Sequence, residues 1–289
     1  MSYTKPVTQL IKQRTSWRSY QERPLDQDIQ KQVQEFLAEQ QVGPFGTSAR
    51  FVLITASAED NEALKGLGTY GFIHGARAFI VGAVKPAANN LEDYGYLMER
   101  IILFATDLGL GTCWLGGTFN KSNFAKKIAI TDNEIVPAVS PLGYGTEKRG
   151  LMDRVVRWGA GSKNRLSWES LFFQDTFSTP LSHETAADYA MPLEMVRLAP
   201  SASNKQPWRI VKEKETAIFH FYLQRTKGYQ KTSERFKMTD LQRVDLGIAM
   251  CHFQLATQEK NLPGTWKILP PTRTPQPEDA QYIVSWLGE

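Results

Sequence analysis

The chain has 289 residues, of which 42% are hydrophobic and 22% charged, and this is the composition of an ordinary globular protein. Its net charge of +4 is too small for a protein that binds nucleic acid or a membrane surface. No apolar run approaches the ~20 residues that cross a bilayer, and the first residues lack the pattern of a signal peptide. We therefore expect a cytoplasmic protein that binds neither nucleic acid nor membrane.

Cysteine and histidine are too sparse to suggest metal chemistry. The two cysteines, Cys113 and Cys251, form no CxxC pair, which argues against a disulfide framework and a cysteine-based zinc site. The four histidines are scattered, so the sequence contains no HExxH-type metal motif. Any demanding chemistry must come from a bound organic cofactor or from the positioning of a substrate, or the protein carries out none.

The hydrophobic pattern predicts a mixture of helices and strands. In chain order we expect helices at Gln9–Trp17 and Asp28–Gln41, strands at Phe51–Thr55 and Ala78–Val84, a helix at Glu92–Leu108, a strand at Ile135–Leu142, and helices at Pro192–Leu198 and Leu246–Glu259. Residues 147–163 are basic and contain glycine, which makes them the best candidate for a linker between two domains.

Parts of the sequence recur at a nearly constant spacing. Pro24-Leu25 and Pro44 recur 156 residues later as Pro180-Leu181 and Pro200, and Gly111-Thr112 recurs 153 residues later as Gly264-Thr265. Because these matches keep the same order, they predict two related halves, residues 1–160 and 161–289. The alternative is two unrelated domains that share short matches by chance.

A loop of small polar residues follows the expected helix at Pro192–Leu198. It reads Ala199-Pro200-Ser201-Ala202-Ser203-Asn204-Lys205-Gln206-Pro207-Trp208. Its backbone N–H groups and its Ser and Asn side chains are suited to hydrogen-bonding a polar ligand. Loops that bind nothing have the same composition, so the pattern alone leaves both interpretations open.

Two arginines near the N-terminus form a second candidate. In Arg14-Thr15-Ser16-Trp17-Arg18, the two arginines lie four residues apart, which on a helix places them on one face. Neighbouring guanidinium groups repel each other unless an anion lies between them, and their geometry fits a phosphate. The alternative is a solvated basic end of a helix.

A glycine-rich segment follows the expected helix at Glu92–Leu108. It reads Gly109-Leu110-Gly111-Thr112-Cys113-Trp114-Leu115-Gly116-Gly117. Glycines allow the backbone to approach a flat ligand closely. The spacing matches neither a dinucleotide fingerprint nor a P-loop, so the segment by itself is a weak signal.

Together, these three segments resemble the FMN-dependent nitroreductase superfamily. The resemblance rests on Arg14-x-Ser16-x-Arg18-x-Tyr20 followed by Pro24-Leu25, on the Ala199–Trp208 loop, and on Gly109–Gly117 with Gly143-Tyr144. It is closer to a fused, double-length branch first found in a thermophilic bacterium, and it covers almost the whole chain. It implies a nitroreductase-like α+β fold with α/β/α layers, whose two tandem halves form an intramolecular pseudo-dimer.

Proteins of this superfamily are usually homodimers that bind FMN between their subunits. The resemblance therefore implies one FMN site per chain, between the two halves, in a protein that is expected to be a monomer, with further association of such monomers as the alternative. The cofactor-binding residues that it implies are Arg14, Thr15, Ser16, Arg18, Leu115, Gly116, Gly117, Lys163, Arg165, Pro200, Ser201, Ala202 and Asn204. Lys163 and Arg165 match a phosphate-binding Lys-x-Arg pair, with Lys148-Arg149 and Arg154 as alternatives.

A mirror-image second site is expected to be lost. Gly43–Ser48 stands where half 1 would carry its own copy of the Ala199–Trp208 loop. Glu169, or Gln174 in another alignment, stands where Arg18 would recur in half 2. Neither residue supplies a cation, and a carboxylate repels a phosphate.

The resemblance implies an oxidoreductase that transfers hydride from NADH or NADPH through FMN to a small electron-poor acceptor, such as a nitroaromatic or a quinone. Because the flavin carries this chemistry, no catalytic side chain and no metal are required, and we expect no Ser/His/Asp constellation. The alternatives are a non-catalytic flavin-binding or flavin-sensing protein, and an FMN-dependent dehalogenase or flavin reductase.

Overall fold

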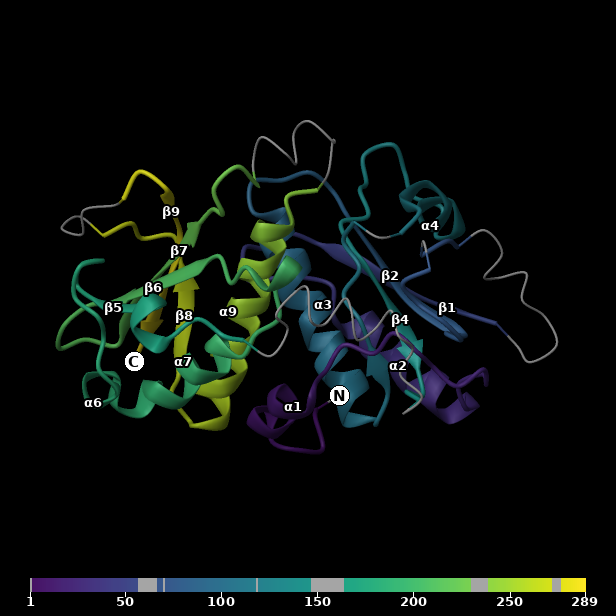
Figure 1. Cartoon of the computed structure of the whole chain (residues 1–289), viewed down its shortest axis with the longest axis horizontal. Helices are drawn as coiled ribbons and strands as arrows, with labels where there is room; N and C mark the ends of the chain where they lie inside the picture. Colours follow the sequence, from purple (N-terminus) through teal and green to yellow (C-terminus); the bar gives the residue numbers. More distant parts are fainter. Residues whose placement is uncertain are drawn as a thin grey trace. The chain divides into compact units, whose positions relative to one another are not determined.

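The computed structural model describes residues 2–56, 67–69, 71–117, 119–146, 164–229, 239–271 and 277–289. The chain divides into two compact units, Met1–Ser162 (unit 1) and Lys163–Glu289 (unit 2). Each unit combines helices with one sheet (Figure 1), so the α+β class expected from the sequence is confirmed. The expected linker at residues 147–163 lies outside the described residues.

Unit 1 is built around a four-stranded antiparallel sheet with the order β1-β2-β4-β3. Every residue of β2 is buried, which explains why this strand is a continuous apolar run in the sequence. The long helix α3 packs on β1, β2 and β3 and is itself mostly buried. The elements are α1 (Val7–Gln13), α2 (Gln27–Glu39), β1 (Ala49–Thr55), β2 (Ala78–Val84), α3 (Asn90–Asp107), β3 (Gly111–Thr112), α4 (Lys121–Lys127) and β4 (Val139–Gly143).

Unit 2 is built around a five-stranded sheet with the order β5-β6-β7-β9-β8, in which only the edge pair β5 and β6 is parallel. Phe253 of the long helix α9 packs against Phe219 and Phe221 of β7 and against Trp286 of β9. The elements are η2 (Trp168–Ser170), β5 (Phe172–Gln174), α6 (His183–Ala186), η3 (Ala187–Tyr189), α7 (Ala190–Arg197), η4 (Ala202–Asn204), β6 (Trp208–Lys212), β7 (Ile218–Gln224), α9 (Leu241–Glu259), β8 (Gly264–Lys267) and β9 (Ala280–Gly288).

The two units share one order of strands. Apart from the additional edge strand β5, the order β6-β7-β9-β8 in unit 2 repeats the order β1-β2-β4-β3 in unit 1, and all these pairs are antiparallel. In each unit the long helix precedes the edge strand: α3 leads into β3, and α9 leads into β8. None of the helices in the described part of the chain is long and apolar enough to cross a bilayer.

The two long helices also end in the same way. Gly109 follows α3 with φ of 76°, and Asn261 follows α9 with φ of 55°. In both cases the N–H groups of this left-handed residue and of the next residue donate to carbonyls of the last helical turn, at 2.8–3.1 Å. The two equivalent positions are 152 residues apart, close to the spacing of the sequence repeats.

Candidate functional site

The segment that carries the two arginines is extended rather than helical, so the expected helix at Gln9–Trp17 is wrong beyond Gln13. Its backbone pairs with other parts of unit 1. Ser16 forms a parallel bridge with Thr112, and the N–H of Trp17 donates to the carbonyl of Thr112 at 2.8 Å. These long-range hydrogen bonds replace the helical ones, because backbone groups that are buried must find partners somewhere.

Because the segment is extended, helical spacing no longer explains why Arg14 and Arg18 would lie on the same side of it. Side chains alternate between the two faces of an extended segment, so Arg14, Ser16 and Arg18 share one side. The backbone pairing of Ser16 with Thr112 also places this segment next to the glycine-rich segment. Two groups of the predicted site residues are therefore neighbours within unit 1.

The glycines of the glycine-rich segment serve mostly structural purposes. Gly109 is the left-handed residue that ends α3, with φ of 76°. A Cβ on Gly111 would overlap the ring of Trp17, and a Cβ on Gly145 would overlap the same ring. The indole of Trp17 therefore lies against backbone at both places, and these glycines do not support the expected contact with a flat ligand.

The remaining residues of this segment are better placed to meet a ligand. Leu115 is buried and exchanges two backbone hydrogen bonds with Val139, each at 2.9 Å. Gly116 is half-buried and Gly117 is exposed immediately after this pair. The pairing of Leu115 therefore fixes the point from which the backbone of Gly116 and Gly117 leaves the sheet.

Arg14 is a buried cation. Its side chain is 8% exposed, and its Nε lies 3.8 Å from Oε1 of Glu99, a carboxylate on α3 whose side chain is fully buried. Within the part of the chain that the structure describes, no group hydrogen-bonds the Nε of Arg14. The other carboxylate oxygen of Glu99 accepts a hydrogen bond from the indole of Trp114 at 2.8 Å. A guanidinium that is buried with one distant carboxylate has capacity for a further anionic partner.

In unit 2, the Ala199–Trp208 loop connects α7 to β6, as expected, and its backbone is strained. Ser203, Asn204 and Gln206 all have positive φ, between 49° and 54°. Residues other than glycine adopt this region rarely, and such strain clusters at ligand sites. The loop therefore has a conformation that the surrounding hydrogen bonds must enforce.

Side chains of the loop provide several of these hydrogen bonds. The hydroxyl of Ser201 accepts the N–H of Gln206 at 2.8 Å, and the amide oxygen of Gln206 accepts the N–H of Leu166 at 2.8 Å. The amide of Asn204 donates to the carbonyl of Asn164 at 2.7 Å. Pro200, Ser201 and Ala202 are half-buried, so part of each remains accessible.

The side chain of Arg165 contacts the Ala199–Trp208 loop and the end of the helix that precedes it. One of its terminal nitrogens donates to the side-chain oxygen of Asn204 at 3.0 Å, and the other donates to the carbonyl of Leu198 at 3.1 Å. Arg165 therefore brings a positive charge to the loop within unit 2. Lys163, Lys148-Arg149 and Arg154 lie outside the described residues. Of the expected Lys-x-Arg pair, the structure therefore describes only Arg165.

Asp245, on the second turn of α9, bonds the backbone of the Ala199–Trp208 loop. Its Oδ1 accepts the N–H of Ala202 at 2.9 Å, while none of the described residues hydrogen-bonds its Oδ2. Burial raises the pKa of this carboxyl well above its usual range. Asp245 is a residue that sequence reasoning missed, although an acidic residue within the apolar pattern of a helix is the signal of a buried carboxyl.

Unit 1 contains a similar anchor at Asp93, 152 residues earlier on α3. Its two oxygens accept the N–H groups of Phe45 and Thr47 at 2.9 and 2.8 Å. This carboxylate therefore binds the Gly43–Ser48 segment, as Asp245 binds the Ala199–Trp208 loop. A Cβ on Gly43 would overlap the Asp93 side chain, so the segment closes tightly over the carboxylate. Both carboxylate oxygens of Asp93 accept hydrogen bonds, whereas only one oxygen of Asp245 accepts a hydrogen bond from the described residues.

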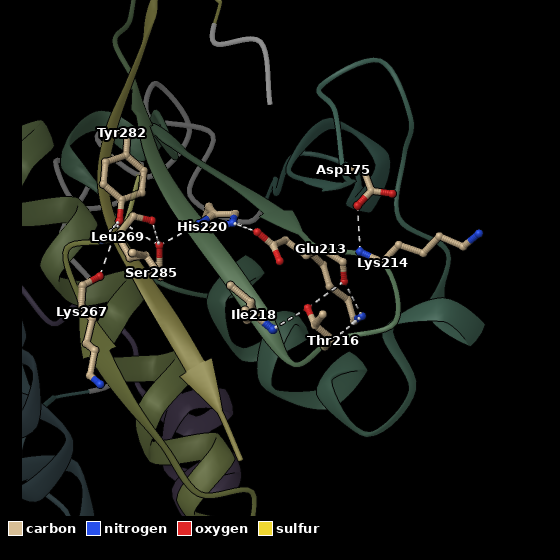
Figure 2. A network of polar contacts seen from close by, with 11 residues as sticks. Asp175, Glu213, Lys214, Thr216, Ile218, His220, Lys267, Leu269, Tyr282 and Ser285 are labelled. Atoms are coloured by element: carbon tan, nitrogen blue, oxygen red, sulfur yellow. Dashed lines mark hydrogen bonds and ion pairs between the residues drawn. The ribbon is translucent and has the colours of Figure 1, made fainter. Parts of the chain in front are cut away.

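A Ser–His–Glu set lies in unit 2, contrary to the expectation that there is no such constellation (Figure 2). His220 and Ser285 are buried, whereas the Glu213 side chain is 39% exposed. Nδ1 of His220 lies 2.7 Å from the hydroxyl of Ser285, and Nε2 lies 2.9 Å from Glu213. Ser285 is fully buried and its hydroxyl donates to the carbonyl of Leu269 at 3.0 Å. The hydroxyl of Tyr282 accepts the N–H of Leu269 at 2.8 Å. With its serine inaccessible, the set ties β7 and β9 to the segment that follows β8.

These observations define a class of protein before they define a family. The chain is an α+β protein whose two units share one strand order apart from β5, with a buried arginine in unit 1 and a strained polar loop in unit 2. It has a nitroreductase-like fold, and a solved structure has the same fold. A "putative nitroreductase" from Thermotoga maritima superimposes with a TM-score of 0.61 at 19% identity, over 99% of this chain and 95% of that chain. The chain matches the family model "Putative TM nitroreductase" over residues 6–257, and it belongs to this family.

Other solved structures align with about half of the chain. A nitroreductase with bound FMN from Bacteroides fragilis covers 51% of this chain with 92% of its own, at 21% identity and a TM-score of 0.39. An oxidoreductase that contains FMN covers 51% of this chain with 81% of its own, at 21% identity and a TM-score of 0.42. No curated protein sequence matches the chain. Among the described residues, no group of His, Cys, Asp and Glu side chains is arranged to hold a metal ion.

Proposed function

We propose that this protein is an FMN-dependent oxidoreductase that transfers hydride from NADH or NADPH to a small electron-poor acceptor, such as a nitroaromatic or a quinone. Membership of the nitroreductase family supports the reaction class. The observation that carries the proposal is the buried guanidinium of Arg14, whose Nε has no hydrogen-bond partner among the described residues and which begins an extended segment paired with the glycine-rich segment.

The described residues fit the phosphate of FMN. This group carries nearly two negative charges at neutral pH, and its oxygens accept hydrogen bonds. Arg14, Ser16 and Arg18 supply two guanidinium groups and a hydroxyl from one side of the extended segment, with Thr15 between them. Each charge-assisted hydrogen bond contributes ~1.5 to 3 kcal/mol. Arg165 would add a third cation from unit 2.

The strained loop of unit 2 would hold the rest of the cofactor. Ser201 and Asn204 carry a hydroxyl and an amide on a loop that Asp245 bonds at the N–H of Ala202 and that Arg165 bonds at the side chain of Asn204. Pro200 and Ala202 would offer apolar surface beside them. In unit 1, the backbone N–H groups near Gly116 and Gly117, at the end of the Leu115 pair, would face the ring of the cofactor.

Bound FMN would supply the hydride chemistry, and the chain's own task is to bind and orient it. This explains why the proposed site needs no nucleophile, and the proposal assigns no role in it to Ser285, His220 or Glu213. The proposed site takes residues from both units. We therefore propose that units 1 and 2 are two copies of one fold that form a pseudo-dimer in a monomeric chain, with one FMN per chain.

The visible spectrum of the purified protein is the first experiment. We expect a yellow protein with one FMN per chain, whose flavin absorbance bleaches within seconds when NADH or NADPH is added without oxygen. Bound FMN that neither nucleotide reduces would favour a flavin-binding or sensing role. A protein that stays colourless after incubation with FMN would contradict the proposal. A screen of acceptors would then separate nitroreduction from dehalogenation or flavin reduction.

Arg18→Ala tests the phosphate contact directly. Loss of ~2 kcal/mol would weaken FMN binding about 30-fold, measured by quenching of flavin fluorescence. The matched control is Arg23→Ala, which removes an exposed arginine that lies over the ring of Tyr144 and pairs with Asp26. The control should bind FMN as the unmodified protein does. An unchanged affinity of Arg18→Ala would place the phosphate elsewhere.

A further inference from the structure

Glu99 occupies a position where a carboxylate is expensive. It lies in the middle of α3, and its side chain is completely buried. Removing a charge from water costs several kcal/mol unless partners compensate for it. The groups that contact the Glu99 carboxylate therefore indicate the role of this residue.

The two oxygens of Glu99 point to two different segments. Oε2 accepts the indole N–H of Trp114, in the glycine-rich segment, at 2.8 Å. Oε1 lies 3.8 Å from Nε of Arg14, which begins the extended arginine segment. One carboxylate thus contacts both segments of unit 1 that contribute to the proposed cofactor site.

The contact with Arg14 restricts the direction of its guanidinium. This group is a rigid plane whose N–H bonds diverge around its edge, so it can contact anions on more than one side. With the Nε edge facing Glu99, the opposite edge cannot face the same carboxylate. Because Arg14 is itself only 8% exposed, it has little room to adopt another orientation.

We propose that Glu99 is a positioning residue that orients Arg14 for the phosphate of FMN and fixes the Trp114 segment beside it. This inference rests on the proposed function. Glu99 also carries a negative charge of its own, which opposes the binding of a phosphate. The orientation of Arg14 by Glu99 would strengthen FMN binding, and the repulsion between Glu99 and the phosphate would weaken it. The effect of removing the Glu99 charge on FMN affinity therefore shows which of the two dominates.

The test compares FMN with riboflavin, which lacks the phosphate. Glu99→Gln keeps the size of the side chain but removes the charge that faces Arg14. We expect it to weaken FMN binding about tenfold and to leave riboflavin binding within about twofold. Glu92→Gln is the matched control, because Glu92 is also buried on α3 but lies two turns earlier. The control should leave both affinities unchanged.

A double variant shows whether Glu99 acts through Arg14. In an Arg14→Ala background, Glu99→Gln should weaken FMN binding by no more than about twofold further, because the residue that it orients is gone. If Glu99→Gln does not fold, Trp114→Phe provides the test. It removes the donor to Oε2, and we expect about threefold weaker FMN binding with riboflavin binding unchanged.

Three results would overturn the inference. Equal weakening of FMN and riboflavin would show that Glu99 supports only the fold, and tighter FMN binding would show that its repulsion of the phosphate dominates. In both cases the unmodified protein still binds FMN, so the proposed function stands. If the unmodified protein binds neither compound, the inference and the proposed function fail together.

Discussion

Asp93 makes the stability of unit 1 depend on pH. Burial raises the pKa of its carboxyl to about 6, although the N–H groups of Phe45 and Thr47, which donate to it, act in the opposite direction. The folded protein therefore holds this proton up to a higher pH than the unfolded chain does. Asp93 accordingly favours folding at acidic pH, and the contribution is lost as the pH rises from about 4 through about 6.

The size of this effect follows from the shift. About two pKa units correspond to about 3 kcal/mol, of which about 2 kcal/mol is lost between about pH 4.5 and about pH 7. We expect the free energy of unfolding of the unmodified protein, minus that of Asp93→Asn, to fall by this amount over the interval. Urea denaturation at the two pH values measures it.

Asp132→Asn is the control, because Asp132 is exposed in a turn of the same unit. The difference between this variant and the unmodified protein should not change with pH. A difference for Asp93→Asn that is equally flat would refute the reasoning. It would mean that the two N–H donors compensate fully for the burial of the charge.

Three further predictions concern the proposed site. Gly145→Ala should lower the free energy of unfolding by ~1 to 3 kcal/mol in urea denaturation, because the new Cβ would overlap Trp17, and it should weaken FMN binding in a fluorescence titration. Arg165→Ala removes the donors to Asn204 and to the carbonyl of Leu198, so we expect about tenfold weaker FMN binding, whereas an unchanged affinity would remove Arg165 from the site. Ser201→Ala leaves the N–H of Gln206 without its acceptor and should cost ~1 kcal/mol in thermal unfolding.

The sequence predicted the elements whose signal is local. The strand at Ala78–Val84 has the expected bounds, because a fully buried strand is a continuous apolar run. The long helix at Asn90–Asp107 was predicted within two residues at each end, since Gly109 marks where it stops. The strand expected at Ile135–Leu142 begins only at Val139, because Ile135 forms just an isolated bridge with Val84.

The sequence failed where partners distant in the chain determine the backbone. The helix expected through Trp17 ends at Gln13, because pairing of Ser16 with Thr112 outweighs a local helical preference. The Ser285–His220–Glu213 set was missed for the same reason, since Ser285 is 65 residues from His220 and reaches it only when β7 and β9 pair. Within the site, composition identified the loop and the arginines, but not Glu99 or Asp245, whose roles depend on what buries them.

The repeated strand order would have an evolutionary consequence if the two units are copies of one fold, as we propose. In an ordinary homodimer, one gene encodes both subunits, so every substitution appears twice and neither copy of a loop can change without the other. Here the segments anchored by Asp93 and by Asp245 are encoded separately. If units 1 and 2 are the two copies that we propose, one segment could close over its carboxylate with both oxygens bonded, while the other could keep its strained backbone.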